Sequence, residues 1–100
     1  MIVPIYGLKY YSFSNPSIDE LLVLHKEKNN PHDEFAIAAY NTKNEKVGYL
    51  SRKAIEKFRI YDYITTDVYF SRIWAIYPNQ LLVELDLSNN PLPKKKYNLK

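Results

Sequence analysis

The chain has 100 residues, of which 46% are hydrophobic and none is cysteine; this composition indicates one folded domain and excludes disulfides and cysteine-based zinc sites. The formal net charge is +3, but residues 1–90 carry only 10 cations against 11 acids, a net charge of −1. This near-zero net charge excludes a protein that holds nucleic acid through an excess of positive charge alone. Nucleic-acid binding would therefore need a local pocket.

The N-terminal half of the sequence predicts strands separated by turns. Residues 2–13 are extended in character, and Ser14–Ser17 carries the Asn-Pro chemistry of a turn. The apolar run Leu21–His25 predicts a short buried strand. Phe35–Tyr40 and Lys46–Leu50 are apolar runs on either side of a polar turn, a pattern that predicts a hairpin.

A helix and two further strands are predicted in the second half. Ser51 is a candidate N-cap, and the apolar residues within 54–58 share one face of a helix of about three turns at most. Residues 68–77 predict a long strand. Its apolar stretch Ile73–Tyr77 could be core or an interface, and we expect the core, because a small barrel has little else to bury. A last strand is predicted by alternation of apolar with polar residues, which is typical of a half-buried strand: Leu81, Val83, Leu85 and Leu87 alternate with Glu84, Asp86 and Ser88.

These elements predict a mainly β fold with one or two short α-helices. Strands and helices do not alternate regularly, which disfavours a parallel sheet, and a small barrel of five or six strands would hide the sheet edges best. A second short helix near Ile18 stays open as an alternative. We expect the barrel domain to span residues 1–90, followed by a flexible basic tail over residues 91–100. This tail contains the remaining cations: Lys94, Lys95, Lys96 and Lys100.

No segment of the sequence has the character of a membrane span or a signal peptide. The longest strongly apolar run is Leu21–Leu24, whereas a helix needs about 20 such residues to cross a bilayer. Residues 1–6 lack the basic region and the small-residue cleavage site of a secretory leader. Together with the lack of cysteine, these features predict a cytoplasmic protein without a membrane partner.

Catalytic chemistry finds little support in the sequence. His25, His32 and Asp33 fit no standard spacing of zinc ligands. The two glycines, Gly7 and Gly48, lie too far apart for a glycine-rich phosphate loop, and no Gly-x-Ser-x-Gly elbow is present. We therefore predict no catalytic residue, no metal and no cofactor, with a small nuclease that uses His32 and Asp33 as a remote alternative.

Three clusters combine glycine, aromatic rings and charges: Gly7–Tyr11, Asn30–Ile37 and Val47–Arg52. Each alone has a plain structural interpretation, as a half-exposed strand or as a turn in which an Asx side chain bonds its own backbone. Together, the Gly-Leu-Lys-Tyr-Tyr, Asn-Pro-x-Asp-x-x-Ala-Ile and Gly-Tyr-Leu motifs resemble the HIRAN domain. The resemblance is clear over residues 3–60 and depends on the strand pattern beyond them.

The resemblance implies a variant of the OB-fold barrel that captures the 3′-hydroxyl end of single-stranded DNA. It assigns Lys9 to the terminal phosphate, and Tyr10 and Tyr11 to stacking on the terminal base. Lys9 stands where DNA-binding members of the family carry Arg, so the bidentate fork that suits phosphate is lost here. No counterpart is assigned to pocket residues of the family after Phe58.

The resemblance also places Asp33 as the loop carboxylate that accepts the hydrogen bond of the free 3′-hydroxyl. His32 occupies the position of an aromatic residue before that carboxylate, and Tyr49 is the pocket aromatic after the second glycine. The sequence thus predicts a DNA-end binding module without catalysis, serving a repair or processing enzyme such as a helicase or nuclease on another chain. The alternative is a protein-interaction module that uses the same aromatic pocket or a free barrel edge.

Overall fold

The computed structural model describes residues 1–64 and 68–85. The flexible tail predicted for residues 91–100 lies outside the described residues, as does the end of the alternating pattern at Leu87. The elements in chain order are β1 (Ile2–Tyr6), the 3₁₀ helix η1 (Leu8–Tyr10), β2 (Leu21–Lys26), β3 (Ile37–Tyr40), β4 (Lys46–Leu50), α1 (Arg52–Phe58), α2 (Ile60–Tyr63), β5 (Tyr69–Ile76) and β6 (Leu81–Glu84).

The six strands form a closed antiparallel barrel in the order β1-β4-β3-β2-β5-β6, with β6 pairing back onto β1. This confirms the prediction of a small OB-like barrel with one or two short helices. Closure satisfies the backbone hydrogen bonds that an open sheet leaves at its edges. The prediction of a free barrel edge is therefore wrong, since none of the six described strands lies at an open edge.

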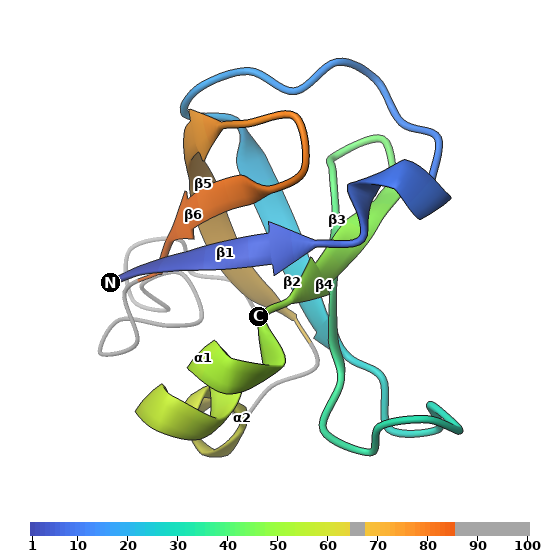
Figure 1. Ribbon diagram of the computed structural model, residues 1–100, viewed down its shortest axis with the longest axis vertical. Coiled ribbons are helices and arrows are strands. Elements are labelled where there is room, and N and C mark those ends of the chain that lie inside the picture. Colours follow the sequence, from blue (N-terminus) through green and yellow to red (C-terminus); the bar gives the residue numbers. More distant parts are fainter. Residues whose placement is uncertain (65–67, 86–100) are drawn as a thin grey trace, which may run out of the picture.

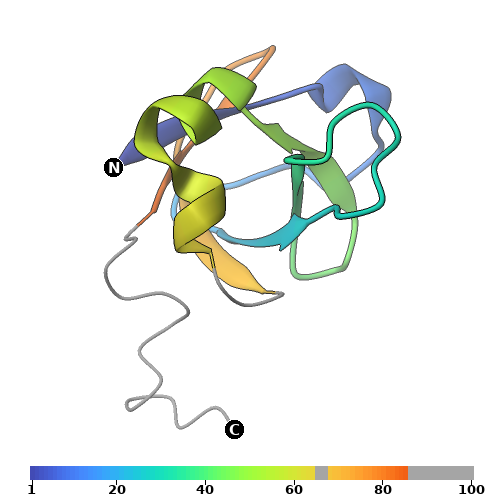
Figure 2. The ribbon, with the colours of Figure 1, turned by 90° about the horizontal axis from the view of Figure 1, so that it is seen from below.

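Alternation along the strands fills the barrel with aliphatic side chains. Val3 and Ile5 of β1 point inward, and in the register of the β1–β6 pair they face Val83 and Leu81. The helices lie at the lower end of the barrel in Figure 1 and lie in front of one side of it when it is seen from below in Figure 2. They complete the core with buried apolar side chains: Ala54, Ile55 and Ile60.

The two glycines occupy backbone positions that other residues fit poorly. Gly7 precedes η1 with φ 87°, in the left-handed region that glycine adopts without steric cost. At Gly48, a Cβ would collide with the backbone carbonyl oxygen of Tyr6 on the neighbouring strand. The second position therefore requires glycine because β4 and the end of β1 approach each other closely.

Local structure differs from the prediction near Ile18, at η1 and at α2, and agrees with it at the N-cap of α1. No helix forms near Ile18; residues 18 and 19 make a turn, with Asp19 at φ 73°. Within the predicted extended segment 2–13, the chain turns into η1. Ser51 is the N-cap of α1 as predicted, accepting a hydrogen bond from the backbone N–H of Ala54 at 3.2 Å. The additional helix α2 follows α1 after Arg59, which has φ 54°.

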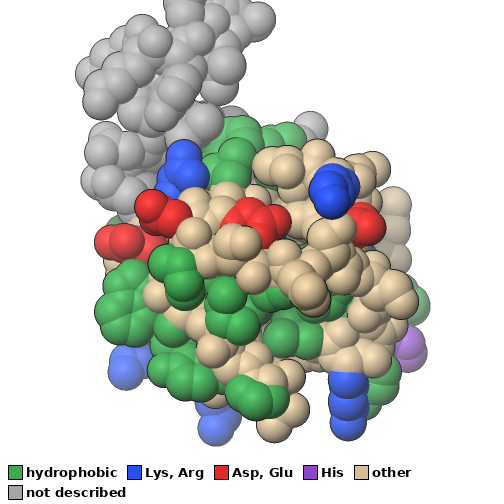
Figure 3. All heavy atoms as spheres, turned by 90° about the horizontal axis from the view of Figure 1, so that it is seen from above, with side chains coloured by type: hydrophobic (Ala, Val, Ile, Leu, Met, Phe, Trp, Pro, Cys, Tyr) green, Lys and Arg blue, Asp and Glu red, His purple; other side chains and the backbone are tan. Residues whose placement is uncertain are grey.

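The expectation that Ile73–Tyr77 lies in the core is wrong for most of the segment. Ile73 is buried, but Trp74 is 56% exposed, and Ile76 and Tyr77 are also exposed. The pairing of β5 with β6 shifts register between Ile73 and Ala75, and alternation places Trp74 on the outside. Figure 3 shows hydrophobic side chains gathered over one side of the upper face of the molecule.

Within the described part of the chain, no helix combines the length and the apolar character needed to span a membrane.

Candidate nucleic-acid interface

Asn30 organises the loop between β2 and β3. Its Oδ1 accepts hydrogen bonds from the backbone N–H groups of His32 and Asp33, at 2.8 and 2.9 Å. This Asx-turn chemistry, followed by proline at position 31, fixes the course of the loop. Asp33 extends the pattern, because its Oδ1 accepts from the backbone N–H of Phe35 at 2.9 Å. The plain structural interpretation of the Asn-Pro-x-Asp segment is therefore correct, and it holds the loop beside the barrel.

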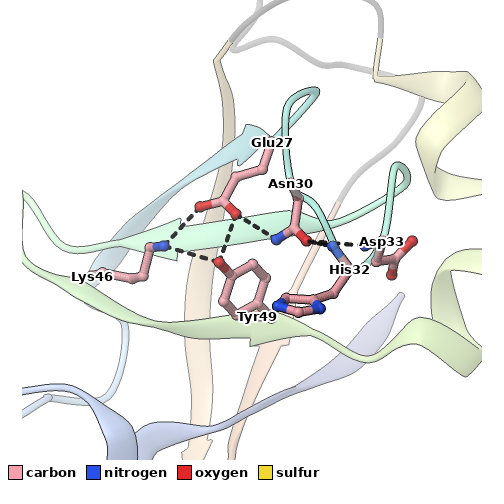
Figure 4. Close-up of polar contacts among 6 residues, drawn as sticks. All are labelled: Glu27, Asn30, His32, Asp33, Lys46 and Tyr49. Carbon is pink, nitrogen blue, oxygen red and sulfur yellow. Dashed lines mark hydrogen bonds and ion pairs between the residues drawn. The ribbon is translucent and has the colours of Figure 1, made fainter.

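A polar network connects this loop to strand β4 (Figure 4). One carboxylate oxygen of Glu27 accepts from the Tyr49 hydroxyl at 2.6 Å and from Asn30 Nδ2 at 2.9 Å. The other oxygen pairs with the Lys46 ammonium at 2.7 Å. The same ammonium donates to the Tyr49 hydroxyl at 3.0 Å. The network joins the loop that follows β2 to strand β4, and the side chains of Glu27 and Lys46 within it are only about one-quarter exposed.

Electrostatics within the network keep Glu27 and Lys46 charged. Burial alone would raise the pKa of the Glu27 carboxyl, but hydrogen bonds from Lys46, Tyr49 and Asn30 outweigh it and lower the pKa below its ordinary 4.5. Burial would likewise lower the pKa of Lys46, yet its bonds to Glu27 and Tyr49 raise it. Burial, followed by the bond to anionic Glu27, raises the pKa of Tyr49 to about 12, so its hydroxyl stays protonated.

An open cavity of about 740 Å³ lies against this network. We call it the end cavity; it is lined by residues 25–32 and Tyr49. Its wall carries two lysines, Lys26 and Lys28, two histidines and one acid, Glu27. The pKa of Lys26 is lowered by burial and then by the charge of Lys28. The Lys26 ammonium itself lies over the Tyr61 ring of α2, 4.0 Å from its centre. With two lysines against one acid, the wall of the end cavity has a small excess of positive charge.

Asp33 does not line the end cavity. Its carboxylate forms an ion pair with Arg52 of α1, with 3.1 Å between Asp33 Oδ2 and Arg52 Nε. Figure 4 shows the Asp33 carboxylate directed away from Tyr49, whereas the His32 ring lies next to Tyr49. The Arg52 guanidinium also lies over the Phe35 ring at 5.1 Å and so holds the far end of the loop against α1.

The predicted residues on and after η1 lie in a separate place. Tyr10 is 73% exposed, and the Lys9 ammonium lies 5.2 Å from the centre of its ring. Lys9 lines two smaller cavities, of about 470 and 260 Å³, between η1 and the turn that joins β5 to β6. Tyr11 alone approaches the network: its ring centre lies 6.4 Å from that of Tyr49 and 5.5 Å from the Lys46 ammonium.

The structure thus brings His32 and Tyr49 to one cavity, with Tyr11 beside it, and does not bring Lys9, Tyr10 or Asp33 to the same wall. The sequence interpretation overlooked the charged residues of the site: Lys26, Glu27, Lys28, Lys46 and Arg52. One signal was available for part of this set, since Lys26, Glu27 and Lys28 directly precede the Asn-Asn-Pro segment.

Among residues 1–64 and 68–85, no group of three or more His, Asp or Glu side chains gathers as a metal ion would require. The imidazole of His25 instead meets the ring of Tyr40 edge to face, with 5.3 Å between ring centres.

The chain is thus a small closed barrel with an open cavity on its side, whose lining includes two lysines and one tyrosine. The sequence matches the HIRAN domain family over residues 1–80, and the chain belongs to this family. The match supports a DNA-binding module in general, in a type of domain that is not itself catalytic. A search of curated protein sequences finds no match.

Two solved structures have the same fold. The HIRAN domain of human HLTF superposes with a TM-score of 0.65 at 19% sequence identity, covering 83% of this chain and 69% of that chain. A protein from Lactobacillus plantarum superposes with a TM-score of 0.68 at 16% identity, covering 82% of this chain and 85% of the other.

Proposed function

We propose that this domain binds the 3′-hydroxyl end of single-stranded DNA in the end cavity. It serves as a targeting module for a DNA repair or processing enzyme, such as a helicase or nuclease, on another chain. The observation that carries this proposal is the end cavity itself, whose cations and hydrogen-bonding groups lie against the tyrosine of Gly-Tyr-Leu. A volume of about 740 Å³ is within the ~300–1,000 Å³ range of ligand pockets.

The charges of the end cavity suit a strand terminus better than a long duplex. Lys26 and Lys28 would neutralise only a few phosphates, and residues 1–90 have no cationic excess. Each phosphate contact on a single strand contributes about −0.7 to the slope of log K against log salt. Two such contacts predict a slope of roughly −1.4, and a further phosphate contact from Lys9 would add about −0.7, still much shallower than the slope of an extended groove.

Aromatic rings supply contacts that do not depend on base identity. Tyr49 and His32 lie side by side at the end cavity, and Tyr11 follows on the side toward η1. Stacking on such rings contributes ~1–3 kcal/mol per base. Under this proposal the terminal base contacts Tyr49 and His32, while Lys9 and Tyr10 contact nucleotides further along the strand.

Binding of short fluorescent oligonucleotides tests the proposal. Strands with a free 3′-hydroxyl should bind, and strands whose 3′ end is phosphorylated or closed into a hairpin should bind at least tenfold more weakly. Replacing Lys26 and Lys28 by Gln should lower affinity for all sequences alike. Lys57→Gln is the matched control, because Lys57 lies on α1 and does not line the end cavity. Equal binding of all three ends by the unmodified protein would refute end recognition.

A protein-interaction function is the second candidate, and one observation favours it. Several outward side chains of β1 and β5 are apolar and exposed, including Trp74 at 56% and Tyr6 at 48%. Exposed aromatic residues are enriched at protein interfaces. Failure of every oligonucleotide to bind would favour this candidate over DNA binding.

A further inference from the structure

We propose that the His32 side chain is a proton-dependent phosphate ligand of the end cavity, so that the domain takes up a proton when it binds a DNA strand end. This inference rests on the proposed function and adds a binding residue and a pH dependence to the same site. It concerns a phosphate of the strand and not the terminal hydroxyl, so it leaves the assignment of Asp33 unchanged.

The backbone of His32 is fixed at the end cavity, while its ring has no partner in the protein. The backbone N–H donates to Asn30 Oδ1 at 2.8 Å. The residue is exposed and lines the end cavity, and its ring lies next to Tyr49 (Figure 4). Within residues 1–64 and 68–85, neither imidazole nitrogen has a hydrogen-bond or ion-pair partner. Both nitrogens are therefore available to a ligand.

The nearby carboxylates already have cations of their own. Glu27 is the one acid among the described residues that line the end cavity, and its carboxylate binds the Lys46 ammonium at 2.7 Å. Asp33 does not line the cavity, and its carboxylate pairs with Arg52 at 3.1 Å. Neither acid is thus left to balance a positive charge on the His32 ring.

The other titratable groups beside the ring supply no negative charge at neutral pH. Burial, followed by the bond to Glu27, raises the pKa of Tyr49 to about 12, so its hydroxyl stays protonated. Tyr11 follows on the side toward η1, with an uncharged ring. The remaining charged side chains of the wall are cations: Lys26 and Lys28. A protonated His32 ring therefore lacks a counter-ion in the free protein, and a phosphate of the strand would supply one.

The chemistry of imidazole matches a phosphate in this position. Histidine is the side chain whose charge ordinarily changes between about pH 5 and 8. Its protonated ring donates from both nitrogens, and charge-assisted hydrogen bonds to phosphate are roughly twice as strong as neutral ones. Binding then stabilises the protonated ring. Because the coupling between proton and strand is reciprocal, affinity for the strand rises as pH falls.

The experiment measures binding of a short oligothymidylate with a free 3′-hydroxyl and a pH-insensitive dye, at about pH 5.5 and about pH 8. Neither thymine nor the phosphodiester changes charge in this range. The unmodified protein should bind about fivefold more tightly at the lower pH, since an exposed ion pair contributes up to roughly this factor. The slope of log K against log salt should become steeper by about 0.7, the contribution of one added phosphate contact.

Two substitutions at position 32 separate the charge of the side chain from its shape. His32→Phe keeps a ring that is never charged, so it should lose most of the pH dependence and keep the shallow slope. His32→Lys is charged at both pH values, so it should also lose the pH dependence but keep the steeper slope. The turn uses only the backbone N–H of this residue, so both variants should unfold at the same urea concentration as the unmodified protein. A merely structural role would not give the two variants different salt slopes.

The second histidine of the wall is tested in the same assay. The ring of His25 packs edge to face on that of Tyr40, with 5.3 Å between ring centres. His25→Gln should therefore retain the pH dependence of binding. If His25→Gln loses it and His32→Phe does not, the assignment to His32 is overturned.

The outcomes also separate this inference from the proposed function. If the unmodified protein binds the free 3′-hydroxyl end with the same affinity and salt slope at both pH values, the inference is overturned while end recognition stands. If it binds no oligonucleotide at either pH, the proposed function fails and the inference fails with it.

Discussion

Removing the Tyr49 hydroxyl isolates the contribution of the Glu27 network to stability. Tyr49→Phe keeps the ring and deletes one donor at 2.6 Å from Glu27 and one acceptor at 3.0 Å from Lys46. Hydrogen bonds to charged groups contribute about 1.5–3 kcal/mol. The Glu27 side chain is 23% exposed, so solvent screening reduces this, and we expect a loss of about 1–2 kcal/mol in the free energy of unfolding.

The loss should depend on pH in a defined direction. The folded-state pKa of Glu27 lies below the ordinary 4.5, so the network contributes fully above about pH 4.5. The contribution of the network is lost as pH falls through the folded-state pKa of Glu27, because below that pH the carboxyl group is protonated in both the folded and the unfolded protein. The difference between Tyr49→Phe and the unmodified protein should therefore be largest near pH 7 and shrink below pH 4.5.

Urea unfolding followed by circular dichroism, at pH 7 and at decreasing pH through the folded-state titration of Glu27, measures this difference. Thermal unfolding provides a second reading, since each kcal/mol shifts the midpoint of a domain of this size by roughly 4–8 °C. Tyr63→Phe is the matched control, because Tyr63 on α2 is 57% exposed and should lose less than about 0.5 kcal/mol. A loss for Tyr49→Phe that stays equal as pH falls through the folded-state titration of Glu27 would show that the anionic carboxylate is not its partner.

Two further substitutions test the backbone argument and the helix cap. Gly48→Ala should cost about 2–4 kcal/mol in urea unfolding, because its Cβ would collide with the Tyr6 carbonyl oxygen; a cost below 1 kcal/mol would contradict the close approach of β1 and β4. Ser51→Ala should cost about 1 kcal/mol through loss of the cap on α1, and Ser51→Asp should restore most of it; no difference between the two variants would argue against the cap.

The strand pattern of the chain could be predicted where one face of a strand is buried and the other is not. Leu21–Lys26 and Leu81–Glu84 follow this rule, and both strands lie where alternation and apolar runs place them. The segment Ile73–Tyr77 could not be placed in the same way, because it is apolar at every position and residue type does not show which side chains face the core. The register shift between Ile73 and Ala75 depends on the pairing with β6, and the residue types of this segment do not indicate it.

The candidate site was only partly predictable for a related reason. Asn30 and its turn are local, so their hydrogen bonds follow from residue types and spacing. The contact of Glu27 with Tyr49 spans 22 residues and that with Lys46 spans 19. Both depend on the register of β3 with β4, which shifts between Ala39 and Tyr40. Charge pairs that depend on strand register can therefore be identified only from the three-dimensional structure.

Mapping the binding surface tests most directly whether the end cavity holds the DNA end. Titration of the ¹⁵N-labelled protein with a short 3′-hydroxyl oligonucleotide should shift the backbone amide signals of residues 25–30, His32 and Tyr49. Pro31 has no amide to report, and the outward face of β1 and β5 around Trp74 should stay unchanged. Shifts confined to that outward face, or no shift at all at saturating oligonucleotide, would contradict the account.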